Sequence, residues 1–187
     1  MDTTIETLGE PRIDSPLHEG QHVEETERVL FDLSADALEK QIKEGASPVS
    51  FLKAGPRRRI YFDPSKLKCA IVTCGGLCPG LNNVIRSLVL TLHHTYHVRN
   101  IIGIRYGLQG FIPKFGHPVL QLSPEEVSEI NEVGGTILSS SRGPQDIGEI
   151  VDSLERMNVG ILFTIGGDGS FRAGPESRKK FAIETRR

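Results

Sequence analysis

The segment Thr73–Asn83 constrains the fold of this 187-residue chain more than any other part of its sequence. An apolar run, Cys69–Cys74, leads into it, the paired glycines Gly75 and Gly76 come next, and a helical pattern begins near Leu81. Glycines let the backbone turn tightly and come close to a ligand. The first turn of a helix presents free N–H groups and a positive dipole end. The segment therefore predicts a strand, a glycine turn and a helix, with an anion, most commonly a phosphate, bound at the turn.

The rest of the chain alternates strand-like and helix-like segments. This alternation predicts an α/β fold with an open, mostly parallel sheet and helices on both faces. A second glycine turn, Gly166–Ser170, directly follows the apolar run 160–165. Loops rich in glycine or small residues also follow Ile104 and cover Ser139–Gly143. Because ligands bind outside the carboxyl ends of the strands in such sheets, we expect all these loops to lie along one ligand-binding edge.

Capping residues and apolar spacing place the individual elements. Ser34 is a suitable N-cap for a helix that ends at Gly45, and Ser123–Glu126 is a capping box with proline at the first helical position. Apolar residues recur at helical spacing between Ile147 and Leu154. The expected helices cover residues 34–45, 81–92, 123–133 and 147–154, and the expected strands cover residues 69–74, 100–104, 119–122 and 160–165.

The sequence predicts three regions. They are an N-terminal extension over residues 1–59 that is partly disordered, an α/β domain over residues 60–172, and an aberrant or disordered tail over residues 173–187. Little fixed structure is expected before Val29, where the chain is acidic and weakly patterned. The basic run Arg57–Arg59 is interpreted as a solvated edge or, alternatively, as an anion or subunit contact. The tail has little apolar stripe with which to cover a sheet, so the α/β domain is expected to be incomplete at its C-terminal end.

Charge and cysteine content exclude several functions. The net charge of −2 provides no basic field for nucleic acid or for a membrane surface. No apolar run approaches the roughly 20 residues that span a bilayer, and the acidic N-terminus lacks the apolar core of a signal peptide. The cysteines Cys69, Cys74 and Cys78 are odd in number, which favours reduced thiols over a disulfide framework. We therefore expect a cytoplasmic protein with no nucleic-acid or membrane partner.

The turn Gly166–Ser170 is the strongest chemical signal. Asp168 is expected at a strand tip, where a carboxylate can hold Mg²⁺ directly or through water, and that ion would neutralise nucleotide phosphates during phosphoryl transfer. The Ser170 hydroxyl can donate to a phosphate. By itself the turn could equally be an inert connection between a strand and a helix. Its pairing with the Gly75–Gly76 turn at the same edge favours the phosphate site.

Two other groups could bind a metal. His93 and His97 are four residues apart at a helix end, which is more typical of a solvated surface than of a metal site. Cys74 and Cys78 are separated by three residues but lack the second pair that a structural zinc site needs. They are interpreted as small loop residues, one of which could be sensitive to oxidation.

Four motifs, taken together in their order and spacing, resemble the phosphofructokinase family. The resemblance covers roughly residues 60–172. The lead-in Ile60–Pro64 and the long N-terminal arm look like the branch of ATP-using enzymes related to the pyrophosphate-dependent ones. Each motif alone is common, whereas the four together are specific. The motifs are Thr73–Asn83, Tyr106–Gly110, Gly134–Arg142 and Gly166–Ser170.

The resemblance implies phosphoryl transfer from ATP to the 1-hydroxyl of fructose 6-phosphate, giving fructose 1,6-bisphosphate in glycolysis. It also implies a nucleotide-binding domain at residues 60–172, a need for Mg²⁺ and, in the full-length enzyme, a homo-oligomer. Gly169 stands where pyrophosphate-using members typically carry Asp, whose charge and bulk would exclude the ATP α-phosphate, so ATP is the expected donor. The resemblance implies that Gly75 contacts the nucleotide phosphates through its backbone, that Tyr106 lies near the nucleotide and that Gly143 lies against it. It implies that Arg142 contacts the transferring phosphoryl group and that Asp168 binds Mg²⁺. It also implies that a phosphate cradle is formed by Gly167, Gly169 and Ser170.

The chain departs from the family in one respect. The family's catalytic base lies in a Thr-x-Asp-Asn-Asp motif that follows the Gly-Gly-Asp-Gly turn, and this sequence holds no such motif. The base and the sugar-binding residues are therefore assigned to no residue, and the chain is expected to be a truncated N-terminal portion in which transfer is very slow. Two alternatives stay open. One is another kinase with a Gly-Gly-Asp-Gly turn, such as a lipid or NAD kinase, and the other is an inactive nucleotide-binding fragment.

Overall fold

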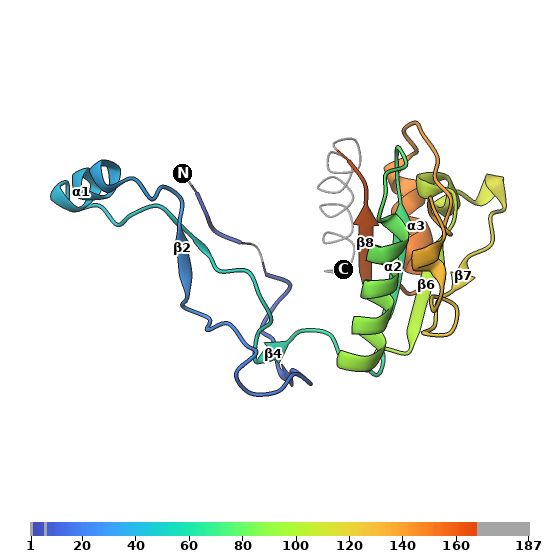
Figure 1. The fold of residues 1–187 in the computed structure, drawn as a ribbon, viewed down its shortest axis with the longest axis horizontal. Helices are drawn as coiled ribbons and strands as arrows, with labels where there is room; N and C mark the ends of the chain where they lie inside the picture. Colours follow the sequence, from blue (N-terminus) through green and yellow to red (C-terminus); the bar gives the residue numbers. More distant parts are fainter. Residues whose placement is uncertain (1, 6, 168–187) are drawn as a thin grey trace. The chain divides into compact units, whose positions relative to one another are not determined.

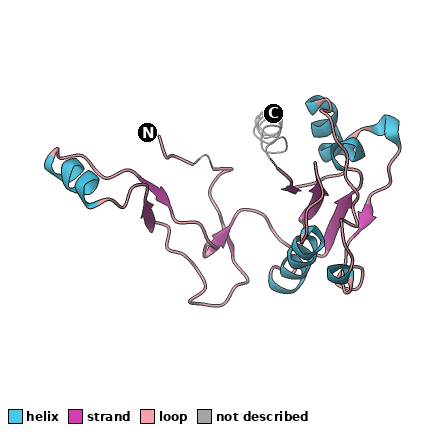
Figure 2. Ribbon diagram, turned by 45° about the horizontal axis from the view of Figure 1, so that its top comes forward, coloured by secondary structure: helices cyan, strands magenta, loops and turns pink. Residues whose placement is uncertain are grey.

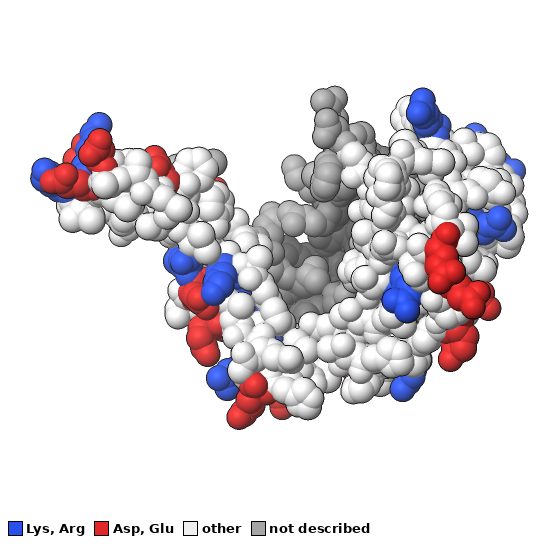
Figure 3. All heavy atoms as spheres, viewed as in Figure 1, with Lys and Arg blue, Asp and Glu red and all other residues white. Residues whose placement is uncertain are grey.

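The computed structural model describes residues 2–5 and 7–167. The chain divides into two units, Met1–Tyr61 and Phe62–Arg187, and each has its own pattern of pairing and packing. No helix among the described residues is long and apolar enough to cross a membrane. On the face seen in Figure 3, lysines and arginines are interspersed with acidic residues.

The second unit is built on a four-stranded sheet with the order β7-β6-β5-β8 (Figure 1). The central strand β5 (Lys68–Thr73) pairs in parallel with β6 (Asn100–Ile104) on one side and with β8 (Ile161–Ile165) on the other. The short strand β7 (Leu120–Gln121) runs antiparallel along β6. The predicted α/β fold with a mostly parallel sheet is confirmed, with one antiparallel strand at its edge.

Helices cover both faces of this sheet, as predicted (Figure 2). Successive side chains of a strand point to opposite faces, so Ile71 packs in the core on the side of α2 (Leu81–Leu90), while Val72 packs in the core on the side of α3 (Ile147–Arg156). Five of the six β5 residues are buried, which explains why the strand reads as a nearly continuous apolar run. The sheet is thus fixed by two cores that share one central strand.

The two α-helices of this unit begin where the sequence predicts. The α2 helix starts after Gly80, whose φ of 93° requires the left-handed conformation, and it ends in a π-helical turn at Thr91–Thr95. The α3 helix is capped by Asp146, whose carboxylate accepts a hydrogen bond of 2.9 Å from the backbone N–H of Glu149. Three short 3₁₀ helices, at Gly107–Phe111, Pro113–Phe115 and Ile130–Glu132, complete the helical segments described.

The helix predicted over residues 123–133 does not form. Ser123 does accept a hydrogen bond of 3.3 Å from the backbone N–H of Glu126, so the cap is present, but only one turn follows it. The Ser128 hydroxyl donates to the carbonyl of Glu125, which an α-helix would use for its own ladder. Val133 then adopts an extended conformation. The capping signal was correct, but local side-chain bonds and the extended conformation of the following loop limited the helix to one turn.

The first unit consists of two short antiparallel ladders and one helix. Strand β1 (Ile13–Asp14) pairs with β4 (Arg59–Ile60), and β2 (Arg28–Leu30) pairs with β3 (Ser50–Leu52). The helix α1 (Ala35–Lys43) has no buried residue, and neither has any other described part of this unit. The ladder at β1 lies in a stretch where the sequence predicted little fixed structure, because a two-residue pairing leaves no periodic signal.

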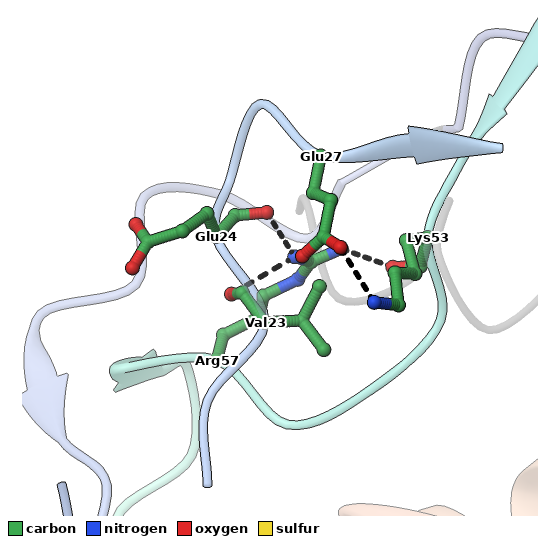
Figure 4. A network of polar contacts seen from close by, with 5 residues as sticks. All are labelled: Val23, Glu24, Glu27, Lys53 and Arg57. Carbon is green, nitrogen blue, oxygen red and sulfur yellow. Dashed lines mark hydrogen bonds and ion pairs between the residues drawn. The ribbon is translucent and has the colours of Figure 1, made fainter. Parts of the chain in front are cut away.

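Arg57 is the main cross-link of the first unit (Figure 4). Its guanidinium group donates to the backbone carbonyls of Val23, Glu24 and Lys53, and the ammonium group of Lys53 pairs with Glu27 beside it. A guanidinium group suits this place because it offers five donors in a fixed plane. The basic run is therefore used within the unit rather than left free for an anion. The next two arginines also pair with acids of the same unit, Arg58 with Glu24 and Arg59 with Asp14.

Candidate functional site

The strand order places a candidate site between β5 and β8. The strand that follows β5 along the chain, β6, lies on one side of it, and β8 lies on the other, so the order reverses at the β5–β8 pair. Ligands bind in open α/β sheets at the carboxyl ends of the strands, at such a reversal. Here the backbone N–H of Cys74 donates to the carbonyl of Ile165 at 2.8 Å. The ends of β5 and β8, from which the chain continues into Gly75 and Gly166, are therefore held side by side.

The first of these turns is an open backbone cradle. Gly75 has a φ of 87°, and a Cβ placed on it would have no neighbour within 4 Å. Gly76 to Gly80 are exposed, and no side chain caps the N-terminus of α2. Left-handed glycine and an uncapped 10-residue helix leave backbone N–H groups available to an anion. The geometry fits a phosphate group, and the predicted contact of Gly75 with nucleotide phosphates stays a prediction.

A third segment is tied to this cradle through hydrogen bonds. The buried hydroxyl of Thr73 donates to the carbonyl of Ser139 at 2.7 Å and lies 3.0 Å from the hydroxyl of Thr136. The hydroxyl of Ser140 donates to the carbonyl of Gly75, also at 2.7 Å. The loop that carries Arg142 is thus attached both to the end of β5 and to the glycine turn. The structure brings the predicted loops 75–80 and 139–143 together.

Arg142 itself is exposed, as is Gly143, whose φ of 99° again needs glycine. An exposed guanidinium group beside an open cradle can contact a phosphoryl group without first losing a buried partner. The positions of both residues agree with a nucleotide site. Their individual contacts with a nucleotide remain predictions.

The backbone of Tyr106 is bonded to the segment that leads to Arg142. Its N–H donates to the carbonyl of Leu138 at 2.8 Å, and its φ of 61° is unusual for a residue with a side chain. Its ring packs against His117 at a centroid distance of 4.2 Å, and the guanidinium carbon of Arg105 lies 5.2 Å from the ring centroid. The ring contact with His117 was not anticipated from the sequence. The predicted place of Tyr106 beside the nucleotide remains a prediction.

Asn82 is a site-forming residue that the sequence reasoning did not single out. It is only 3% exposed, its amide group donates to the carbonyl of Val133 at 2.9 Å, and its amide oxygen accepts from the N–H of Ile137 at 2.9 Å. Both bonds fix the start of the segment that leads to Arg142. A signal was available in the sequence, because Asn82 shares the buried face of α2 with Ile85, three residues further on.

The proposed magnesium ligand, Asp168, lies outside the described residues, together with Gly169 and Ser170. Gly167 is described and is exposed, immediately after β8 and Gly166. Within residues 2–5 and 7–167, no group of three or more histidine, cysteine or carboxylate side chains is arranged to hold a metal ion. The Mg²⁺ site therefore stays a prediction from the sequence.

The histidines near the end of α2 do not form a metal site. A ring nitrogen of His93 lies within hydrogen-bond distance of the guanidinium group of Arg99, and the ring stands edge-on to His94 at 4.8 Å. Desolvation and then the Arg99 charge lower the pKa of His93. A fixed positive charge repels a metal cation, which favours the solvated-surface interpretation.

The cysteines of this unit differ in exposure. Cys69 is fully buried in β5, and burial raises the pKa of its thiol to about 11, so it stays protonated and unreactive. Cys78, in the first glycine turn, is exposed. Any thiol chemistry at this edge would therefore involve the turn rather than the strand.

A separate hollow of about 410 Å³ lies against α3, and no residue of the glycine turns lines it. Three carboxylates and one guanidinium group line it, and this net negative lining repels a nucleotide phosphate. The hollow therefore does not compete with the glycine turns as a phosphate site. Its lining consists of Pro113, Glu149, Asp152, Glu155 and Arg156.

Curated proteins of known name are similar to most of this chain. An ATP-dependent 6-phosphofructokinase of Borreliella burgdorferi is 46% identical over 182 residues, covering 91% of this chain and 39% of that protein. The enzyme of the same name from Amycolatopsis methanolica is 45% identical over 180 residues, covering 92% and 39%. One from Trypanosoma cruzi is 49% identical over 137 residues, covering 73% and 28%. The chain thus spans about two fifths, or less, of the length of these relatives.

Solved structures agree on the fold. Pichia pastoris phosphofructokinase in the T-state matches 82% of this chain and 20% of its own, with a TM-score of 0.55 and 17% identity. The pyrophosphate-dependent phosphofructokinase of Marinobacter aquaeolei matches 60% and 29%, with a TM-score of 0.53 and 15% identity. At such identities the likeness concerns the fold alone. The family model described as Phosphofructokinase matches residues 68–185, more than half of the sequence, and this chain is a member of the phosphofructokinase family.

Proposed function

We propose that this chain binds Mg·ATP between the carboxyl ends of β5 and β8 and supplies the nucleotide site of an ATP-dependent 6-phosphofructokinase. One observation carries the proposal. The Cys74–Ile165 hydrogen bond joins the carboxyl ends of β5 and β8, just before the two glycine turns, where the strand order reverses, and the loop that carries Arg142 is tied to the same place. The names of the relatives, ATP-dependent 6-phosphofructokinases, support ATP as the donor and fructose 6-phosphate as the acceptor.

Each described part has a distinct task in this proposal. The backbone at Gly75 and the N-terminus of α2 receive nucleotide phosphates, and Arg142 neutralises charge on the phosphoryl group in transfer. Tyr106 and Gly143 lie beside the nucleotide. A Mg²⁺ ion held by Asp168 supplies further charge neutralisation to the phosphates. Gly167, the last described residue, extends the cradle together with Gly169 and Ser170, which lie outside the described residues.

The whole reaction is proposed for a protein of the relatives' full length, of which this chain spans about two fifths. We propose that such a protein transfers the ATP phosphoryl group to the 1-hydroxyl of fructose 6-phosphate as a cytoplasmic homo-oligomer. Residues 60–172 then form part of its nucleotide-binding domain, between an extension at 1–59 and the segment 173–187. Gly169, in place of a bulkier and charged Asp, supports ATP over pyrophosphate as the donor.

Titration calorimetry of residues 1–187 with Mg·ATP tests this function. We expect binding by the chain. Gly75→Ala should weaken it at least about tenfold, because a side chain disfavours the left-handed backbone and covers the N–H groups. Gly116→Ala is the matched control, since Gly116 also has a positive φ, of 63°, and open space around it, but lies outside the proposed site. No Mg·ATP binding, or equal weakening by both substitutions, would contradict the proposal.

The same preparation separates the alternatives. Preferential binding of Mg·pyrophosphate over Mg·ATP would contradict the donor assignment. Preferential binding of NAD or diacylglycerol would favour the other kinases that share a Gly-Gly-Asp-Gly turn. A coupled assay with fructose 6-phosphate shows whether the isolated chain turns over. We expect no phosphoryl transfer above the rate without the chain, because the family's base motif is absent from the sequence.

A further inference from the structure

The hydroxyl group of Thr73 lies at the centre of a short chain of hydrogen bonds. A hydroxyl has one proton to donate, and the Thr73 proton goes to the carbonyl of Ser139. The hydroxyl of Thr136, 3.0 Å away, must then donate to Thr73, and it accepts in turn from the N–H of Leu138 at 3.2 Å. The order of donation is fixed from end to end. Such a chain is stronger than its separate bonds because each member polarises the next.

The last acceptor in this series of hydrogen bonds belongs to a strained residue, Ser139. Ser139 has a φ of 57°, a left-handed conformation that side chains disfavour and that persists only where the surroundings enforce it. Its neighbours are held independently. Leu138 is fully buried, and its side chain fits against Gly103, where a Cβ would collide with it. Ser140 donates to Gly75. Thr73 therefore acts on the one residue between Leu138 and Arg142 that has a positive φ.

We propose that Thr73 is the positioning residue for Arg142: its hydroxyl holds Ser139 left-handed and so fixes the direction in which the next residues carry the guanidinium group. This inference rests on the proposed function, because it gives Arg142 the task of contacting the transferring phosphoryl group. Thr73 is 1% exposed, so its side chain is not accessible to a ligand in the proposed site. A serine at position 73 would keep the hydroxyl, whereas a valine would keep the shape and lose it.

The nucleotide series isolates this role. ADP lacks the γ-phosphoryl group, so a misdirected Arg142 should weaken ATP binding selectively. By calorimetry on residues 1–187, Thr73→Val should lower Mg·ATP affinity about tenfold or more while Mg·ADP affinity changes by less than about twofold. Thr73→Ser should behave like the wild type. Thr91→Val, at an exposed position beyond the C-terminal end of α2, is the matched control and should change neither affinity.

A second substitution tests the strain directly. Glycine adopts the left-handed conformation without steric cost, so adding Ser139→Gly to Thr73→Val should restore most of the lost ATP affinity. If Thr73→Val fails to fold, Thr136→Val takes its place, because it removes the partly exposed hydroxyl that orients Thr73, and it should show a smaller loss of the same selectivity.

Hydrogen exchange provides a readout that needs no nucleotide. Thr73→Val should speed amide exchange at residues 139–142 in the free chain and leave β5 protected. Unchanged exchange there, or equal loss of ATP and ADP affinity, would overturn the positioning role. A wild-type chain that binds neither nucleotide would overturn the proposed function instead, and the exchange result would still decide whether Thr73 holds the loop.

Discussion

Residues 1–61 and the described part of the second unit are stabilised by different interactions. In the first unit no described side chain is buried, and the backbone ladders are two or three residues long. In the second, β5 is paired on both sides and contributes side chains to two cores. The first unit depends on Arg57 and on exposed ion pairs, whereas the second depends on apolar burial.

This difference explains where a rigid site can form. Exposed ion pairs contribute little to stability and weaken with salt, while close packing in a core fixes the backbone that leaves it. The glycine turns follow directly on buried strands, so their geometry is determined by the cores. The first unit has no comparable support for a catalytic group.

The largest expected effect is the loss of a core side chain. Ile71→Ala should lower the free energy of unfolding of the second unit by about 2–5 kcal/mol, because it leaves a cavity beside the sheet. Val29→Ala, at a residue of the first unit that is 50% exposed, should change the free energy of unfolding of that unit by less than about 0.5 kcal/mol. Urea denaturation, monitored by hydrogen exchange so that the two units are resolved, measures both changes in free energy. Equal effects would remove the distinction between the units.

A test of packing around the loops comes next. A Cβ on Gly110 would collide with the carbonyl of Arg105 and the side chain of Ile104, so Gly110→Ala should cost about 1–3 kcal/mol. Gly76→Ala is the control, because a Cβ there meets nothing within 4 Å and φ is not in the left-handed region. Thermal unfolding of the two variants gives the comparison, and a tolerated Gly110→Ala would show that this loop is less tightly packed than the cores.

The first unit should respond mainly to the loss of Arg57. Arg57→Ala removes three charge-assisted hydrogen bonds and should destabilise the unit locally by about 1–3 kcal/mol. Amide exchange should rise around Val23 and Lys53, with no change in β5. Arg58→Ala, which removes one exposed pair, should have little effect. Faster exchange throughout β5 in Arg57→Ala would show that the units are not independent.

The smallest effect concerns pH. The pKa of His93 is lowered, first by desolvation and then by the Arg99 charge, with His94 and His97 acting in the same direction and Glu125 opposing them. The folded chain binds a proton there less readily than the unfolded chain. The stabilisation of the folded state by His93 is therefore complete above the ordinary pKa of about 6.5, and it is lost as pH falls from that value through the lowered pKa of the folded chain. His93→Gln should reduce the drop in melting temperature between about pH 7.5 and 5.5, and an unchanged drop would assign it to other groups.

The sequence was sufficient for the elements whose signals are local. Apolar runs located β5, β6 and β8, and the residues around Gly80 and Asp146 located the starts of α2 and α3. The helix predicted after Ser123 was wrong, because local side-chain bonds and the conformation of the following loop end it after one turn. The carbonyl of Val133 is taken by Asn82, 51 positions away, which no local pattern can indicate.

The candidate site was predictable to the same extent. The cradle at Gly75 could be located because paired glycines directly follow an apolar strand, which is a local signal in the sequence. The bonds that assemble the site were not visible, because Thr73 meets Ser139 across 66 positions and Ser140 meets Gly75 across 65. Polar residues on otherwise apolar faces, such as Thr73 and Asn82, are the signal that could have revealed them.

The pairing of β5 with β8 has a consequence for synthesis. Cys69 pairs with Ile101 on one side and with Ile161 on the other, so the second partner is made about ninety residues later. At roughly 5–20 residues per second, one edge of the central strand waits several seconds for its neighbour. An unpaired apolar edge is a template for pairing with other chains. A ribosome that pauses before residue 161 would therefore prolong the period in which the nascent chain is most prone to aggregate.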